Sequence, residues 1–174
     1  MLPQLQQKLN ELTAQKAAFL QIINNATPAQ RLQKPNEQSW NMLQVGHHVL
    51  LAEGGATKFM LTRQPIKISL GQQIKSRLNS IMLTIFLKSP LKFKAPKVVS
   101  TIVAEQQLPL EQLTAQWAEA SEQLTQYLAN FDAAHLKHSV FKHPLVGPLT
   151  ITQTLDFMIE HIQHHIPQLQ RLSK

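Results

Sequence analysis

The residues best suited to chemistry in this sequence are its histidines, of which there are eight. His161 and His165 are four residues apart in a segment that we predict to be helical, so both side chains leave the same face. Neutral imidazole is a good ligand for zinc and nickel. The pair is therefore a candidate half-site for a divalent metal, although buried histidines also occur in ordinary cores. His164, three residues after His161, competes for the same role.

The phase of the last helix separates these three histidines. At about 100° per residue, one buried face is marked by Ile151, Leu155, Met158, Ile162, Leu169 and Leu172. His165 falls within this apolar stripe, His161 lies toward its edge, and His164 lies further round, at the flank. The phase therefore predicts His161 and His165 as the inward-facing pair.

A second histidine cluster lies in an earlier segment that we also predict to be helical. One face of this helix is marked by Val45, Val49, Ala52 and Phe59, and His48 lies beside it. His47 points nearly opposite, toward a side that Leu43 and Leu50 make partly apolar. We prefer His48 as the third metal ligand, and His47 stays open as an alternative.

The composition sets the class of protein and its environment. The 174 residues carry a formal net charge of +7 and include 43% hydrophobic residues and five glycines, which favours one globular helical domain over residues 1–174. There is no cysteine, so disulfides, thiolate nucleophiles and cysteine-based zinc sites are excluded, and a cytoplasmic location is expected. We find no signal peptide and no apolar run of the roughly 20 residues that a membrane span needs.

The periodicity predicts an all-α chain. We expect helices at about 3–24, 41–62, 69–88, 109–130 and 150–172, with no β-strand. Capping boxes, in which a side chain and the residue three positions later cap each other, are predicted at Asn41 with Gln44 and at Thr150 with Gln153. We expect loops at 26–39 and 131–149 and an extended connector at 88–100. Gly54 and Gly55 are expected to allow close helix contact, and Pro167 to kink the last helix.

Two segments and their order resemble a known family. The stretch SWNMLQVGHHVLLAE resembles the start of the second helix in the DinB-like superfamily, where a histidine follows a tryptophan by eight residues, here Trp40 and His48. The stretch FKHPLVGPLTITQTLDFMIEHIQHHIPQLQRL resembles its C-terminal signature, which ends in two histidines four residues apart, here His161 and His165. Lys92 to Pro96, KFKAP, resembles the subgroup named DinB_2. The resemblance covers nearly the whole chain.

The resemblance implies a DinB/YfiT-like four-helix bundle of up-down-down-up type, often a homodimer. It also implies a divalent metal, zinc or nickel, bound by His48, His161 and His165. Members include thiol S-transferases that use bacillithiol or mycothiol and uncharacterised proteins regarded as metal-dependent hydrolases. Others have lost ligands, so a non-catalytic binding or stress-response module is the alternative. His143 and Pro144 match the family pattern as a structural turn rather than as ligands.

Three ligands would leave a tetrahedral ion one open position for water or a small-molecule thiol, which must come from outside the chain. No carboxylate is placed to act as a general base, because Glu53, Asp156 and Glu160 are predicted to lie off the buried faces. We therefore expect a small-molecule substrate and leave the catalytic residues unassigned.

A third interpretation rests on the basic middle of the chain, formed by Lys67, Lys75, Arg77, Lys88, Lys92, Lys94 and Lys97. Such a cluster could contact nucleic acid or anionic lipid. Few aromatic residues are interleaved with it, which argues against nucleic acid.

Overall fold

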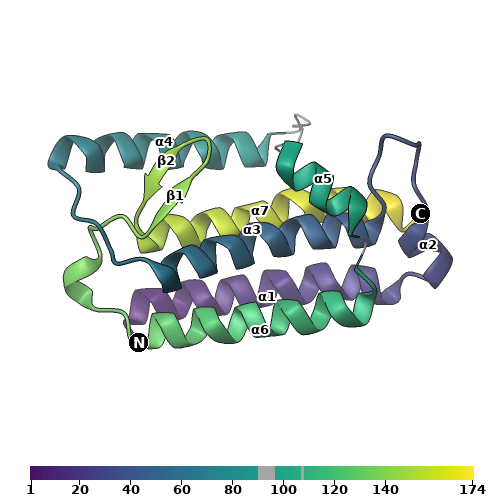
Figure 1. Cartoon of the computed structure of the whole chain (residues 1–174), viewed down its shortest axis with the longest axis horizontal. Coiled ribbons are helices and arrows are strands. Elements are labelled where there is room, and N and C mark those ends of the chain that lie inside the picture. Colours follow the sequence, from purple (N-terminus) through teal and green to yellow (C-terminus); the bar gives the residue numbers. More distant parts are fainter. Residues whose placement is uncertain (90–96, 107) are drawn as a thin grey trace.

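The fold, taken from a computed structural model that describes residues 1–89, 97–106 and 108–174, is a bundle of long helices. The bundle helices are α1 (Pro3–Asn25), α3 (Met42–Thr62), α6 (Leu110–Ala129) and α7 (Ile151–Leu172). Helix α1 packs mainly against α7, and α3 packs against both α6 and α7. In Figure 1, α1 and α7 run in one direction and α3 and α6 in the other. The predicted up-down-down-up four-helix bundle is confirmed.

The core is the apolar interior of these four helices. Its largest fully buried side chains include Trp117 of α6 and Phe19 of α1, whose rings meet edge to face with centroids 5.4 Å apart. The predicted apolar face of α7 is buried from Ile151 to Leu169, and Leu172 is half-buried. Burial of these apolar faces is the main force that holds such a bundle together.

The bounds of the long helices follow from their local sequence. Asn41 and Thr150 cap α3 and α7 in the predicted capping boxes with Gln44 and Gln153. Helix α7 continues through Pro167 to Leu172 as one helix, and the kink predicted beside His165 stays a prediction. Pro167 has no backbone N–H group to donate, yet the residues on both sides of it belong to the same helix.

Helix α4 (Leu70–Lys88) lies outside the four-helix core. It packs against α7 and against a small hairpin, as Figure 1 shows along the upper edge of the molecule. The Ser76 hydroxyl lies 2.8 Å from both the Pro148 carbonyl oxygen and Gln153 Oε1. These contacts attach α4 to the start of α7 and leave its opposite face in solvent.

Several short elements differ from the predictions. The hairpin of β1 (Phe141–His143) and β2 (Gly147–Leu149) lies where we expected no strand, and Gly147 has a positive φ of 81° in its turn. Helix α2 (Pro28–Leu32), capped by Thr27, and the 3₁₀ turn η1 (Ala133–His135) lie in predicted loops. Helix α5 (Lys97–Glu105) replaces the C-terminal part of the predicted extended connector. Lys88 and Ser89, the first residues of that connector, are the end and the C-cap of α4, whereas residues 90–96, with the KFKAP motif, Lys92 and Lys94, lie outside the described residues.

These short elements were missed because each is brief. A three-residue strand has no measurable alternation, and a five-residue helix has no periodicity. Among the described residues, no helix is long and apolar enough to cross a membrane.

Candidate metal centre

Three histidines from two helices meet between α3 and α7. They are His48 of α3 and His161 and His165 of α7, the trio predicted from the sequence. Each offers one ring nitrogen, and these three nitrogens lie within 4.8 Å of one another. The three rings are arranged as a triangle, with centroids 4.8 to 5.0 Å apart.

The distances fit a small cation. His48 Nε2 and His161 Nε2 lie 3.1 Å apart. Two nitrogens bound to a tetrahedral zinc at about 2.0–2.1 Å would be separated by about 3.3 Å. The observed separation is close to this value, and the His165 nitrogen lies within 4.8 Å of the other two. The donor set, three imidazoles, is one that zinc and nickel accept.

The environment keeps the three histidines neutral. Burial, together with the neighbouring His165, His164 and His47, lowers the pKa of His48 to about 3. Burial likewise lowers the pKa of His165 to about 4 and holds the pKa of His161 well below its usual value. A neutral imidazole has a free lone pair, so the trio is ready to bind a cation at neutral pH.

The orientation of His165 is set by a neighbour on the same helix. His165 Nδ1 lies 2.9 Å from Gln168 Oε1. Since an amide oxygen only accepts hydrogen bonds, Nδ1 carries the proton and Nε2 is left with its lone pair. The Nδ1 atom of His48, by contrast, is buried and has no hydrogen-bond partner among the described residues. Sequence analysis missed Gln168, although its position three residues after a predicted ligand was a usable signal.

The two competing histidines lie outside the trio. His164 turns toward α4, where its Nδ1 lies 2.6 Å from the carbonyl oxygen of Leu87. His47 is buried and is not one of the clustered residues. The phase of α7 therefore predicted the inward pair correctly, and the choice of His48 over His47 agrees with the geometry.

Aromatic rings form the walls around the trio. The Trp40 ring lies 5.1 Å from the His48 ring, and Phe157 stacks on His161 at 5.5 Å with an angle of 23°. His143 makes an edge contact with Phe157 at 4.7 Å. Trp40 and Phe157 therefore lie directly against two of the three clustered histidines. Sequence analysis did not single out Phe157, because nothing in its position distinguishes it from an ordinary core residue.

His143 is placed by the hairpin rather than by the trio. Its Nδ1 accepts backbone N–H groups of Leu145 at 3.2 Å and Val146 at 3.4 Å, which fits the predicted structural turn. Burial lowers its pKa to about 4, so it is also neutral.

The carboxylates near the site are engaged elsewhere. Glu53 was predicted to be solvated, but it is only 2% exposed and binds Lys16 of α1 and the Trp117 indole N–H. Asp156 pairs with Lys8 and points outward, as predicted. Glu160 lies 3.6 Å from Lys88, with its side chain only 14% exposed, so the prediction that it is fully solvated is wrong. Among the described residues, no carboxylate joins the histidine cluster.

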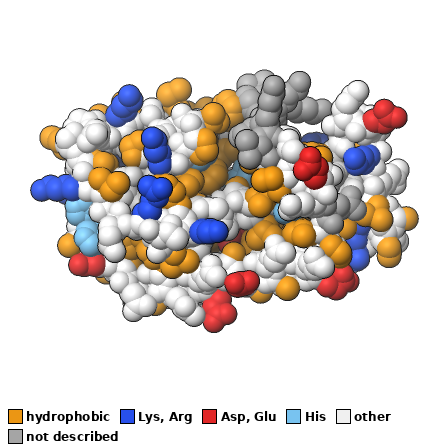
Figure 2. Space-filling view, viewed as in Figure 1, with side chains coloured by type: hydrophobic (Ala, Val, Ile, Leu, Met, Phe, Trp, Pro, Cys, Tyr) orange, Lys and Arg blue, Asp and Glu red, His pale blue; other side chains and the backbone are white. Residues whose placement is uncertain are grey.

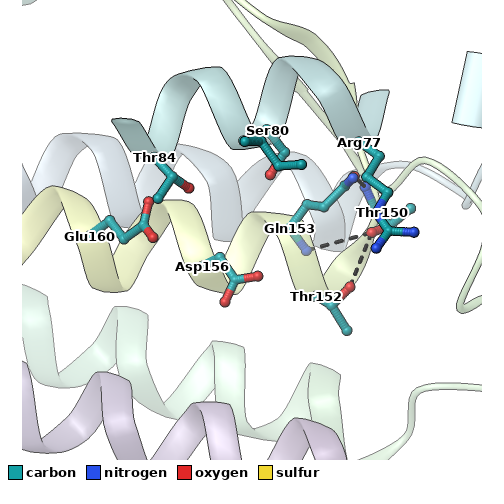
Figure 3. A pocket seen from close by; sticks show the side chains of 9 residues that line it. Arg77, Ser80, Thr84, Thr150, Thr152, Gln153, Asp156 and Glu160 are labelled. Atoms are coloured by element: carbon teal, nitrogen blue, oxygen red, sulfur yellow. Dashed lines mark hydrogen bonds between the residues drawn. The ribbon is translucent and has the colours of Figure 1, made fainter. Parts of the chain in front are cut away.

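A separate groove of about 470 Å³ lies between α4 and α7. Figure 3 shows Arg77 of α4 extending toward Thr150 and Gln153, with Asp156 and Glu160 further along α7. Three of its polar side chains are engaged within the protein, because Gln153 caps α7 and both carboxylates pair with lysines. We assign it no ligand.

Comparisons with known proteins agree with this architecture. The crystal structure of TT2238, a four-helix bundle protein, superimposes with a TM-score of 0.58 at 21% identity, covering 95% of this chain and 98% of that one. At this identity the likeness shows the fold alone. A comparison with curated protein sequences found no significant match. The sequence model of the DinB superfamily matches residues 11–169, and this chain therefore belongs to the DinB superfamily.

Proposed function

We propose that His48, His161 and His165 bind one divalent metal ion, zinc or nickel. The observation that carries the proposal is the convergence of three neutral imidazoles, the buried His161 and His165 and the half-buried His48, two of which have their Nε2 atoms 3.1 Å apart. If no cation lay between these two nitrogens, their lone pairs would face each other in a desolvated site. That arrangement costs free energy unless the two nitrogens share a proton. A metal ion satisfies all three nitrogens at once.

We propose further that the centre serves a metal-dependent enzyme acting on a small molecule, as a thiol S-transferase or a hydrolase. Three neutral ligands leave both positive charges of the ion uncompensated, which favours an anionic fourth ligand from solution. A bound ion lowers the pKa of water or of a thiol and so supplies a nucleophile at neutral pH. Since the chain has no cysteine, the thiol would be a low-molecular-weight cosubstrate.

The surrounding residues have separate tasks in this proposal. Gln168 orients His165, and Trp40 and Phe157 shield the nitrogens from bulk water. His164 is held away by the Leu87 carbonyl group, which prevents it from competing as a ligand. The catalytic residues remain unassigned, because the nearby carboxylates are paired with lysines.

The alternative is a non-catalytic module that binds a small molecule or takes part in a stress response. It is favoured by one observation, the absence of a free carboxylate in the cluster among the described residues. Steady turnover of electrophiles with a thiol, dependent on the metal, would eliminate this alternative. A stoichiometric metal with no turnover of thiol or ester substrates would favour it.

Metal content tests the site directly. Protein purified without a polyhistidine tag and reloaded with zinc or nickel is expected to hold one ion per chain by elemental analysis. His48→Ala, His161→Ala and His165→Ala should each lose most of the bound metal. His135→Ala, outside the trio, is the matched control and should retain it.

Two results would contradict the proposal. One is a reloaded protein that holds no stoichiometric metal. The other is equal metal content in the three ligand variants and in the control.

We also propose, from the superfamily resemblance, a homodimer in the cytoplasm. Light scattering of the purified protein tests the assembly, and fractionation of cells that express it tests the location.

A further inference from the structure

Helix α4 has a second apolar face that nothing in the described structure covers. Its inner face is buried through Leu83 and Leu87, which pack toward α7. Its outer face exposes six large apolar side chains, between 49% and 72% accessible: Leu70, Ile74, Leu78, Ile81, Met82 and Ile85. Near its C-terminal end, Met82, Ile85, Phe86 and Ser89 line a shallow apolar hollow of about 270 Å³.

The outer face is a continuous stripe with basic edges. At about 100° per residue, the six apolar residues fall within an arc of about 120°. Lys75 lies just beyond one edge of this arc and Arg77 just beyond the other. In the described structure, neither forms an ion pair with a carboxylate. This pattern is typical of helices that lie flat in a membrane interface, with basic side chains reaching the headgroups.

The charge on α4 itself has one sign, because the helix carries Lys75, Arg77 and Lys88 and no aspartate or glutamate. Two carboxylates of α7, Asp156 and Glu160, share a groove with Arg77 and are paired with Lys8 and Lys88. In Figure 2, blue basic side chains lie among hydrophobic ones over the part of the molecule that α4 occupies in Figure 1, and most of the red acidic ones lie along the lower and right-hand parts. Basic side chains of α4 therefore border the exposed apolar stripe on both edges.

We propose that the outer face of α4 docks this protein on an anionic lipid bilayer, with the helix axis parallel to the membrane plane. The apolar stripe would enter the boundary between headgroups and acyl chains, while Lys75 and Arg77 contact lipid phosphates. No described helix is suited to span a membrane, which fits peripheral binding. The proposal is independent of the metal centre.

A second copy of the chain fits this face less well. A helix of 19 residues is about 28 Å long and about 10 Å wide. Its outer face offers on the order of 300 Å² to a partner, whereas a stable interface buries about 800 Å² per side. Two such faces would also bring like charges together, because α4 contains no acidic residue.

Vesicle co-sedimentation tests the proposal on the full chain. We expect binding to vesicles that contain phosphatidylglycerol, little binding to pure phosphatidylcholine, and weakening by salt. Ile74→Gln with Leu78→Gln should reduce binding at least about tenfold, because it removes the centre of the apolar stripe. Lys75→Gln with Arg77→Gln should weaken binding to anionic vesicles alone.

The matched control is Leu32→Gln with Leu61→Gln, two leucines exposed to a similar extent on other helices. It should bind vesicles like the unmodified protein. Circular dichroism checks that every variant keeps its helical content, so that lost binding reflects the surface and not unfolding.

Either of two results would overturn the proposal. One is equal sedimentation of the Ile74/Leu78 variant and the unmodified protein with anionic vesicles. The other is no vesicle binding, together with a dimer in light scattering that the Ile74/Leu78 variant dissociates and the control does not. That second result would assign the face to another copy of the chain.

Discussion

Gln168 shows how much of the candidate centre depends on single contacts. Its amide oxygen determines which nitrogen of His165 carries the proton, and hence which nitrogen is available to a cation. Partners of this kind typically change metal affinity by about tenfold to a hundredfold. His161 and His48, whose Nε2 atoms face each other at 3.1 Å, depend instead on the fixed separation of α3 and α7.

At the residue scale we therefore expect Gln168→Ala to weaken zinc binding by about tenfold to a hundredfold without removing it. Competition with a chromophoric chelator measures this affinity. Gln170→Ala, an exposed glutamine on the same helix, is the control and should bind zinc normally. Unchanged affinity in Gln168→Ala would mean that helix packing alone orients His165.

At the scale of elements, α3 is a helix that its neighbours bury on most sides. It contacts α5, α6 and α7, so residues on most sides of it are buried, from Met42 to Met60. Among its glycines, the tightest surroundings are at Gly46, where a Cβ atom would lie 2.7 Å from Leu113 Cδ2 and 3.2 Å from Ile23 Cδ1. We expected this role for Gly54 and Gly55, but Gly55 has no atom near its Cβ position and Gly54 has only ordinary contacts.

A pair of alanine substitutions tests this assignment. Gly55→Ala should raise the free energy of unfolding by about 1 kcal/mol, because alanine favours the helix and the site is open. Gly46→Ala gains the same helix propensity, but it forces the buried Leu113 side chain to shift, which costs about 1–3 kcal/mol. The net effect of Gly46→Ala on the free energy of unfolding should therefore be neutral or destabilising. Urea denaturation measures both, and equal stabilisation by the two substitutions would contradict the assignment.

At the scale of the whole molecule, Glu53 joins three helices of the bundle. It accepts hydrogen bonds from Lys16 of α1 and from the Trp117 indole of α6, 2.7 Å away. Lys16 also binds Ser121 of α6. A buried charge of this kind is held only by its partners, because desolvation opposes it.

We expect Glu53→Ala to lower the free energy of unfolding by about 3–5 kcal/mol, because it removes the carboxylate that pairs with the part-buried Lys16 ammonium and leaves the buried Trp117 indole N–H without an acceptor. Glu53→Gln should cost less, since an amide oxygen can still accept from Trp117. Glu11→Ala, exposed on α1, should stay within about 0.5 kcal/mol of the unmodified protein. A Glu53→Ala protein as stable as the Glu11→Ala control would contradict this role.

The sequence by itself determined the long helices, two of their caps and the inward-facing pair His161 and His165, and it favoured His48 over His47 as the third candidate ligand. Those features follow from periodicity, local capping and motif spacing, which act over a few residues or match a family pattern. The choice of His161 over His164 also needed only helix phase.

The tertiary structure alone decided which sides of each helix are covered. Glu53 is off the main apolar face of α3, yet it is buried because helices pack around that side as well. The outer face of α4 looks like a core stripe in the sequence, yet it remains exposed because α7 covers only the opposite face. Periodicity shows that a helix has an apolar face, whereas the number and placement of its neighbours decide whether that face is buried.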